Sequence, residues 1–109
     1  MGDRGNIVID YGKGKKIYFY THWKGSDIRA ILYRALARKQ RWDDPAYLAR
    51  IIFSELIRGD EGGETGYGIA PYEIDNEHPL LIVDTVNRRV KEGKKTVSFD
   101  DFLFEGVEP

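Results

Sequence analysis

KIYFYTHWKGSDIRAILYRALARK, residues 16–39, places a strand pattern directly before a helix pattern. Residues 16–21 are rich in aromatic and β-branched side chains, which favour a β-strand. Successive side chains of a strand point to opposite faces, so aromatic residues lie on both faces here, and we expect a central strand. From Ile28 onward the apolar side chains recur at the spacing of one buried helical stripe. Ser26 is expected to cap this helix, with Asp27 adding negative charge to its first turn.

Regular structure is predicted on both sides of this stretch. Residues 6–11 form another strand pattern, and a turn rich in glycine and lysine separates it from the strand above, which predicts a β-hairpin. Downstream, Asp44 and Pro45 form a helix start signal, because aspartate caps free N–H groups and proline fits the first helical position. This second helix is expected to run to about Arg58 and to be the central helix, since its apolar residues wrap most of its circumference.

The C-terminal half carries shorter strand patterns between loops. Four glycines among residues 60–68 predict a loop. Ser98 is expected to cap a final short helical turn, and residues 105–109 are expected to fray. Strands are predicted near 69–73, 80–83, 88–91 and 95–97, with a turn at 75–79.

The order of these elements predicts the fold class. Strands come first, helices follow, and strands return, which is typical of a segregated α+β fold. We therefore expect one α+β domain, residues 1–109, with a mostly antiparallel sheet and two main helices packed on one face. The N-terminal hairpin and the C-terminal strands are expected to form that sheet.

Composition excludes several classes of protein. The 109 residues include no cysteine, so disulfide staples and thiolate metal sites are excluded, and a cytoplasmic location is the default expectation. We expect no membrane insertion, because the start lacks a signal-peptide pattern and no run approaches the roughly 18 apolar residues that span a bilayer. No residue pattern indicates a cofactor, and none is predicted.

Charge is distributed unevenly, although the formal net charge is only −1. Residues 1–58 hold 12 Lys or Arg and 6 Asp or Glu, whereas residues 59–109 hold 5 and 12. This asymmetry indicates a basic face opposed by an acidic one, pairing between copies in a homo-oligomer, or neutralisation within the fold, which the near-zero total favours. Without a domain-wide basic excess, non-specific binding to duplex nucleic acid is not expected.

The loop between the strand and the first helix is the first candidate ligand site. Unpaired N–H groups at a helix start attract anions, and His22, Lys24 and Ser26 add donors or charge. Trp23 provides a flat surface on which a base or sugar can stack. The structural alternative is that Ser26 only caps the helix, Trp23 only packs, and Lys24 is solvated.

Arg50 is the second candidate, because it lies within the apolar second helix, where an unpaired charge is expensive. Its guanidinium is expected to pair with Asp43, Glu73 or Glu77, or to contact a ligand phosphate. The internal pair is favoured because buried charges are normally paired.

Two later segments complete the candidate site. The glycine-rich loop is typical of a flexible lid in which Thr65 and Tyr67 offer hydroxyls and a ring, or it is a solvated connector. Glu77 lies in a polar cluster with Asp75 and His78 that a turn explains adequately. No metal ligand and no catalytic residue is assigned. The predicted ligand-binding residues are His22, Trp23, Lys24, Ser26, Arg50, Thr65, Tyr67 and Glu77.

Six short segments together resemble a small family of proteins from tailed bacteriophages and some bacteria. They are Arg4-Gly5-Asn6, His22-Trp23-x-Gly25, Arg41-Trp42-Asp43-Asp44, Tyr47-x-x-Arg50, Glu64-Thr65-Gly66 and Asp75-Asn76-Glu77. The similarity covers nearly the whole chain. The resemblance implies a viral or mobile-element origin and a setting in the host cytoplasm, and it carries over no catalytic residue.

These residues are compatible with three functions. The favoured hypothesis is a non-enzymatic pocket protein that sequesters an anionic, nucleotide-like small molecule, such as a host-made signal. In it Trp23 or Tyr67 stacks a base, while Arg50, Lys24 and backbone N–H groups bind phosphate. The second hypothesis is an interaction module that inhibits a host protein through an aromatic or charged surface. The third is a small metal-dependent hydrolase or nuclease that uses His22 with Asp43, Asp75 or Glu77.

Overall fold

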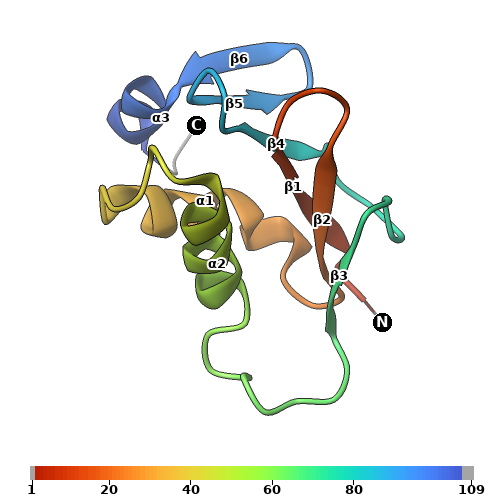
Figure 1. The fold of residues 1–109 in the computed structure, drawn as a ribbon. Helices are drawn as coiled ribbons and strands as arrows, with labels where there is room; N and C mark the ends of the chain where they lie inside the picture. Colours follow the sequence, from red (N-terminus) through yellow and green to blue (C-terminus); the bar gives the residue numbers. More distant parts are fainter. Residues whose placement is uncertain (1, 107–109) are drawn as a thin grey trace.

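A six-stranded sheet with the order β3-β2-β1-β4-β5-β6 runs through the computed structural model, which describes residues 2–106 (Figure 1). Neighbouring strands are antiparallel except for β1 and β4, which are parallel. The sheet is therefore mixed but mostly antiparallel. The strands are β1 (Gly5–Asp10), β2 (Lys16–Thr21), β3 (Tyr67–Ala70), β4 (Leu81–Asp84), β5 (Arg89–Glu92) and β6 (Lys95–Ser98).

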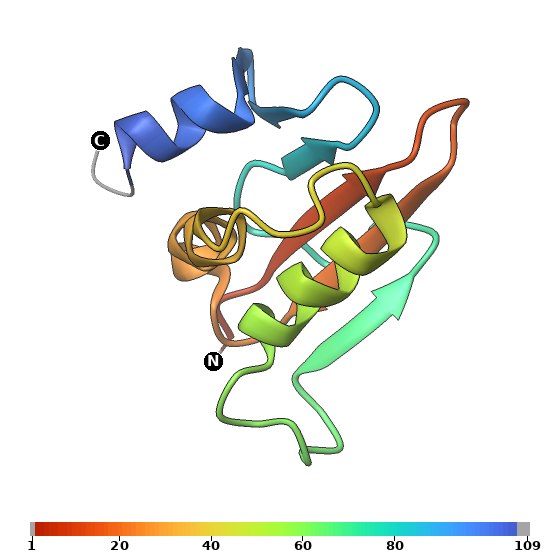
Figure 2. The same ribbon diagram turned by 60° about the vertical axis from the view of Figure 1, so that its left-hand side comes forward.

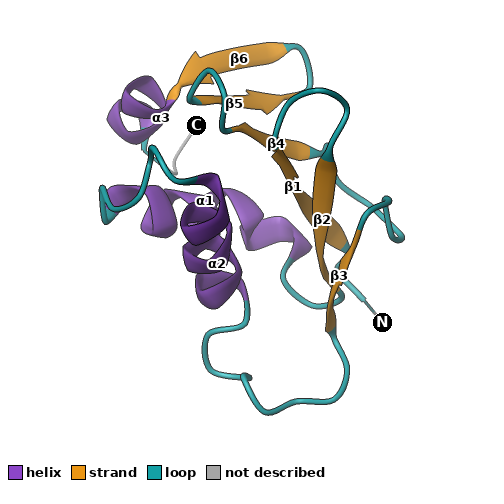
Figure 3. Ribbon diagram, viewed as in Figure 1, coloured by secondary structure: helices purple, strands orange, loops and turns teal. Residues whose placement is uncertain are grey.

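Two helices, α1 (Ile28–Ala37) and α2 (Pro45–Leu56), cover one face of this sheet (Figures 1 and 2). A third helix, α3 (Phe99–Glu105), follows β6 directly and contacts α1, β5 and β6. Figure 3 shows that the helices lie on one side and the strands on the other. The predicted α+β class, with its N-terminal hairpin, C-terminal strands and two main helices on one face, is confirmed.

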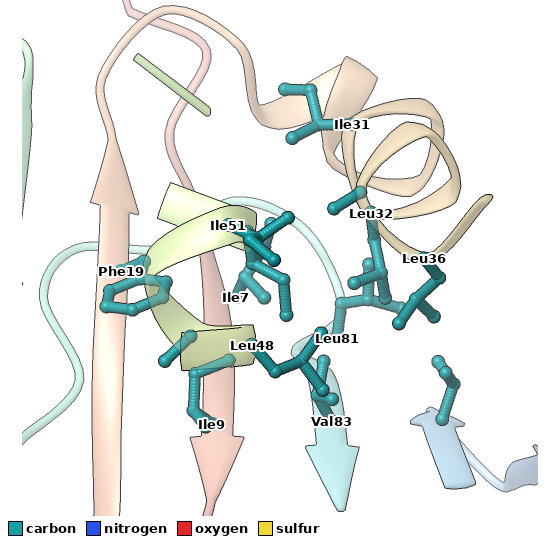
Figure 4. Packing of buried hydrophobic residues seen from close by; sticks show 14 of the residues in the cluster. Ile7, Ile9, Phe19, Ile31, Leu32, Leu36, Leu48, Ile51, Leu81 and Val83 are labelled. Atoms are coloured by element: carbon teal, nitrogen blue, oxygen red, sulfur yellow. The ribbon is translucent and has the colours of Figure 1, made fainter. Parts of the chain in front are cut away.

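The core lies between the sheet and the two main helices (Figure 4). On β1, Ile7 lies opposite Phe19 of β2 and Leu81 of β4, which aligns three apolar side chains toward the helices. The predicted stripe of α1 is buried as expected, and Leu48 and Ile52 of α2 pack against it. Burial of such side chains is the main favourable contribution to folding. No helix among residues 2–106 has the length and apolar character needed to cross a bilayer.

Two of the three predicted helix caps are confirmed. The Asp44 side chain accepts a hydrogen bond from the Tyr47 N–H at 3.5 Å, and Pro45 occupies the start of α2. The Ser98 hydroxyl accepts one from the Asp101 N–H at 3.0 Å. Both side chains satisfy N–H groups that a helix start leaves unpaired.

The prediction that Ser26 caps α1 is wrong. A short 3₁₀ turn, Gly25–Asp27, precedes the helix, which begins at Ile28 without a side-chain cap. The reason is tertiary: the Gly25 N–H donates to the Asp3 carbonyl at 2.7 Å, and the Ser26 N–H donates to Asp3 Oδ2 at 2.9 Å. The segment before β1 therefore accepts the hydrogen bonds of these N–H groups.

Element boundaries differ from the prediction by a few residues. β3 spans Tyr67–Ala70 instead of residues 69–73, because Pro71 follows it and cannot donate to the ladder. α2 ends at Leu56, two residues before the predicted end at Arg58. Glu105 closes α3 and is not frayed, while residues 107–109 lie outside the described residues.

Candidate functional site

His22 is held by the protein on three sides. Its N–H donates to the Gly66 carbonyl at 2.7 Å, and its carbonyl accepts from the Asp3 N–H at 2.7 Å. Its ring Nδ1 lies 2.8 Å from the Tyr20 hydroxyl. Among residues 2–106 it makes no hydrogen bond to Asp43, Asp75 or Glu77, the carboxylates that a hydrolase would pair with it.

Trp23 covers the backbone of the glycine-rich loop. Its ring meets the His22 ring edge-on, with 4.4 Å between centroids, and the side chain is half exposed. Gly66 has a φ of +97°, and a Cβ added there would overlap the Trp23 indole. The indole therefore packs against a backbone that only glycine allows so close.

Substituting Gly66 with alanine is expected to displace Trp23 and to destabilise the protein by about 1–3 kcal/mol, through overlap and an unfavourable positive φ. Gly59 is the matched control, because its φ is +90° but nothing lies within 4 Å of its added Cβ. Chemical denaturation with tryptophan fluorescence measures both effects. Equal losses in Gly66→Ala and Gly59→Ala would show that the Trp23 contact adds nothing.

Lys24 closes the C-terminal end of α2 and is not free in solvent. Its Nζ donates to the carbonyls of Leu56 at 3.0 Å and Arg58 at 3.2 Å. It also lies 5.3 Å from the centre of the Tyr67 ring. Carbonyls at the end of a helix lack partners within the helix, and a lysine there satisfies them. These contacts favour a structural role for Lys24.

Asp3 links two of the predicted site segments. Its Oδ2 accepts from the Ser26 N–H, and its Oδ1 lies 2.5 Å from His78 Nε2. Hydrogen bonds from the Ser26 side chain, from His78 and from the Ser26 backbone lower the pKa of Asp3 from 3.8 to about 2.

This pKa shift predicts acid sensitivity. Because the folded pKa lies below the ordinary value, the ionised Asp3 stabilises the fold above pH 3.8, and the contribution is lost as pH falls toward 2. Urea unfolding between pH 5 and 2 should show a steeper loss for the wild type than for Asp3→Asn. Parallel pH profiles would contradict the assignment.

Glu77 belongs to a structural ion-pair network around Arg4. Glu77 Oε1 accepts from the Arg4 N–H at 2.8 Å, and the Arg4 guanidinium lies 3.3 Å from Oε2. Arg4 also pairs with Asp75 at 3.5 Å. The fully buried Asn6 donates to the Ile74 carbonyl at 2.6 Å. The segment around residues 74–77 is thereby tied to the start of β1.

The prediction that Arg50 is buried among apolar neighbours is wrong. Arg50 is exposed on the outer face of α2, and within residues 2–106 it makes no ion pair with Asp43, Glu73 or Glu77. Instead it lines a surface pocket of about 310 Å³ at the corner between α1 and α2. We call this the arginine pocket; its lining is Arg38, Gln40, Arg41, Tyr47, Arg50 and Ile51.

Positive charge in the arginine pocket is only partly neutralised. Glu55, 3% exposed, lies 2.5 Å from the Arg38 guanidinium and also pairs with Arg34 and Arg58, each at 3.4 Å. Burial opposes ionisation of Glu55, but hydrogen bonding and charge from Arg38 prevail, so its pKa lies below the ordinary value. Arg41 and Arg50 pair with no carboxylate among the described residues.

The connection between α1 and α2 holds the arginine pocket in a defined shape. Lys39 and Arg41 both have a left-handed backbone, with φ of +54° and +59°. Such conformations cost about 1 kcal/mol or more in non-glycine residues and persist where the surroundings impose them. Trp42 anchors the connection, because its ring packs edge-on against Phe99 with centroids 5.3 Å apart. The Arg41 guanidinium lies 4.8 Å from the centre of the Tyr47 ring.

The predicted site residues fall into three separate groups. The first group surrounds Gly66 and the end of α2. It consists of His22, Trp23, Lys24 and Tyr67, with the exposed Thr65 beside them. Ser26 and Glu77 belong to the Asp3 and Arg4 networks. Only Arg50 lines the arginine pocket.

Four residues of the arginine pocket were missed as ligand candidates: Arg38, Gln40, Arg41 and Tyr47. Two signals were present in the sequence. Residues 38–41 read RKQR, a dense run of positive charge, and Tyr47 and Arg50 have the i, i+3 spacing of helical neighbours.

Besides the arginine pocket, the described residues form other surface pockets. Among residues 2–106, no group of three or more His, Asp or Glu side chains could hold a metal ion. The pocket beside the start of α1, of about 380 Å³, is larger than the arginine pocket, and its lining includes Ser26, Arg29 and His78. A scan of the chain against protein-family models and searches of curated proteins and solved structures gave no match.

Proposed function

We propose that this chain is a non-enzymatic protein that binds an anionic, phosphate-bearing small molecule in the arginine pocket. The observation that carries the proposal is the convergence of three guanidinium groups and one tyrosine on a pocket of about 310 Å³. Two of these guanidiniums, those of Arg41 and Arg50, have no carboxylate partner among the described residues. Basic side chains grouped without acidic partners attract anions.

Phosphate is the anion that these groups suit best. A guanidinium presents several N–H donors in one plane and pairs with two phosphate oxygens at once. Arg41 comes from the connection and Arg50 from α2, and both line the pocket. Two such forks fit a diphosphate or a nucleotide better than a single carboxylate.

Stacking of a base is assigned to Tyr47 in this proposal. Tyr47 is 52% exposed and lines the same pocket as Arg50. Trp23 and Tyr67, the rings that the sequence suggests for stacking, lie with the group around Gly66 instead. A nucleotide-like ligand would place phosphate on the arginines and its base against the face of the Tyr47 ring that the Arg41 guanidinium does not cover.

Sequestration in a host cytoplasm is the biological setting we propose. The resemblance to bacteriophage proteins supports it. A binder of this kind would lower the free concentration of a host-made nucleotide without changing it chemically.

Thermal unfolding against a panel of phosphate compounds tests the proposal. Inorganic phosphate, diphosphate and nucleoside mono-, di- and triphosphates are compared with the matching nucleosides and with sodium chloride at equal ionic strength. A ligand present at about 100 times its Kd stabilises the native state by about 2.7 kcal/mol, which raises Tm by roughly 10 °C or more in a domain of this size. Equal Tm values with phosphates and chloride would contradict the proposal.

A further inference from the structure

We infer that the free edge of β3 accepts an extended segment of a partner protein, bearing lysine or arginine at its ends, as a seventh strand of the sheet. This inference concerns a different surface from the arginine pocket and stands independently of the proposed function. It corresponds to the second hypothesis from the sequence, an interaction module that binds another protein.

β3 lies at one end of the strand order and pairs only with β2 (Figures 1 and 2). In an antiparallel pair, alternate residues of an edge strand direct their N–H and C=O groups away from the partner. No backbone hydrogen bond joins residues 67–70 to any described segment besides β2. Ile69 and Tyr72 are 57% and 65% exposed along this edge. The edge therefore offers backbone donors, acceptors and apolar contact to an added strand.

The edge at β3 lacks the charged side chains that often protect an edge strand, although the strand is short and Pro71 follows it. Residues 65–72, TGYGIAPY, contain no charged side chain. The opposite edge, β6, begins at Lys95, follows Lys94 directly and continues into α3. Lysine on an edge strand hinders pairing with other chains. Of the two edges of the sheet formed by residues 2–106, the β3 edge is therefore the one without lysine.

The acidic charge around the β3 edge favours a partner segment with basic ends. Residues 60–77 hold six Asp or Glu and no Lys or Arg. Glu64 and Glu73 flank the edge strand, are exposed, and make no ion pair within residues 2–106. A second copy of this chain would bring acidic flanks together, which is unfavourable, whereas basic ends would pair with them.

NMR titration of ¹⁵N-labelled protein with a short synthetic peptide tests the inference. The peptide alternates valine and threonine and carries two lysines at each end. We expect saturable shifts of the amide signals of residues 67–70, and about tenfold weaker binding when glutamates replace the lysines. N-methylation of alternate peptide amides should abolish binding, because it removes the ladder donors.

Charge reversal of the flanks provides the decisive variants. Glu64→Lys with Glu73→Lys should weaken binding of the lysine peptide and strengthen binding of the glutamate peptide. Asp43→Lys with Asp100→Lys is the matched control, because it changes the net charge equally at exposed positions in the α1–α2 connection and on α3. No shifts at residues 67–70, shifts centred on β6, self-association through β3 without peptide, or equal binding by both double variants would overturn the inference.

Discussion

Phe99→Ala is expected to reduce the free energy of unfolding by about 3–5 kcal/mol, the usual range for truncating a fully buried aromatic side chain. Phe99 is 1% exposed, belongs to the main core cluster and supports Trp42. Urea unfolding monitored by circular dichroism measures the loss. Phe104→Ala is the matched control, because Phe104 lies on the same helix and is 91% exposed. A loss below about 1 kcal/mol in Phe99→Ala would contradict the packing of α3 described above.

The same substitution should also weaken ligand binding in protein that is still folded. Phe99 supports Trp42, and Trp42 anchors the connection that presents Arg41 in its left-handed conformation. A looser connection must be ordered when the ligand binds, which reduces affinity. Calorimetric titration with diphosphate at low temperature, where the variant stays folded, separates this effect from unfolding. Unchanged affinity would show that the Trp42 contact does not organise the pocket.

Arg41→Glu combined with Arg50→Glu is expected to weaken diphosphate binding by about 100-fold, equivalent to about 2.7 kcal/mol. The change removes the two guanidiniums that have no carboxylate partner among the described residues and puts repulsive charge in their place. Stability should change little, because Arg50 is exposed and makes no ion pair within residues 2–106. Isothermal titration calorimetry measures the affinity.

A matched double variant controls for the change in net charge. Arg89→Glu with Lys91→Glu alters the charge by the same amount at exposed positions of β5, away from the arginine pocket. Its affinity for diphosphate should stay within about twofold of the wild type, since screening limits the reach of distant charges. Equal weakening in both double variants would mean that diphosphate responds only to overall charge.

Most of the fold was predictable because its local signals agree with its packing. The Asp44 and Ser98 caps act within one turn of chain and the apolar stripe of α1 within a few turns, and the structure has all three. Ser26 failed as a cap because a distant residue, Asp3, bonds its N–H. The parallel pairing of β1 with β4 likewise depends on where the chain returns after the helices, which no short pattern specifies.

The site was less predictable, because several residues that the sequence suggests for it have structural partners that only the fold reveals. Lys24 and Glu77 suited an anion site by type, yet α2 carbonyls and Arg4 hold them. An interior position for Arg50 follows only if Tyr47 belongs to the apolar surface of α2, whereas Tyr47 is half exposed and lines the same pocket as Arg50. The exposed face of α2 is therefore wider than the pattern indicated.

The most direct measurement of the central claim follows the side-chain Nε–Hε signals of the arginines by NMR during addition of inorganic diphosphate. Binding in the arginine pocket predicts large saturable shifts for Arg41 and Arg50 that fit one Kd, with Arg89 on the sheet unaffected. Small, non-saturating shifts of similar size at all arginines would contradict the claim, because they would show that phosphate only screens the surface charge.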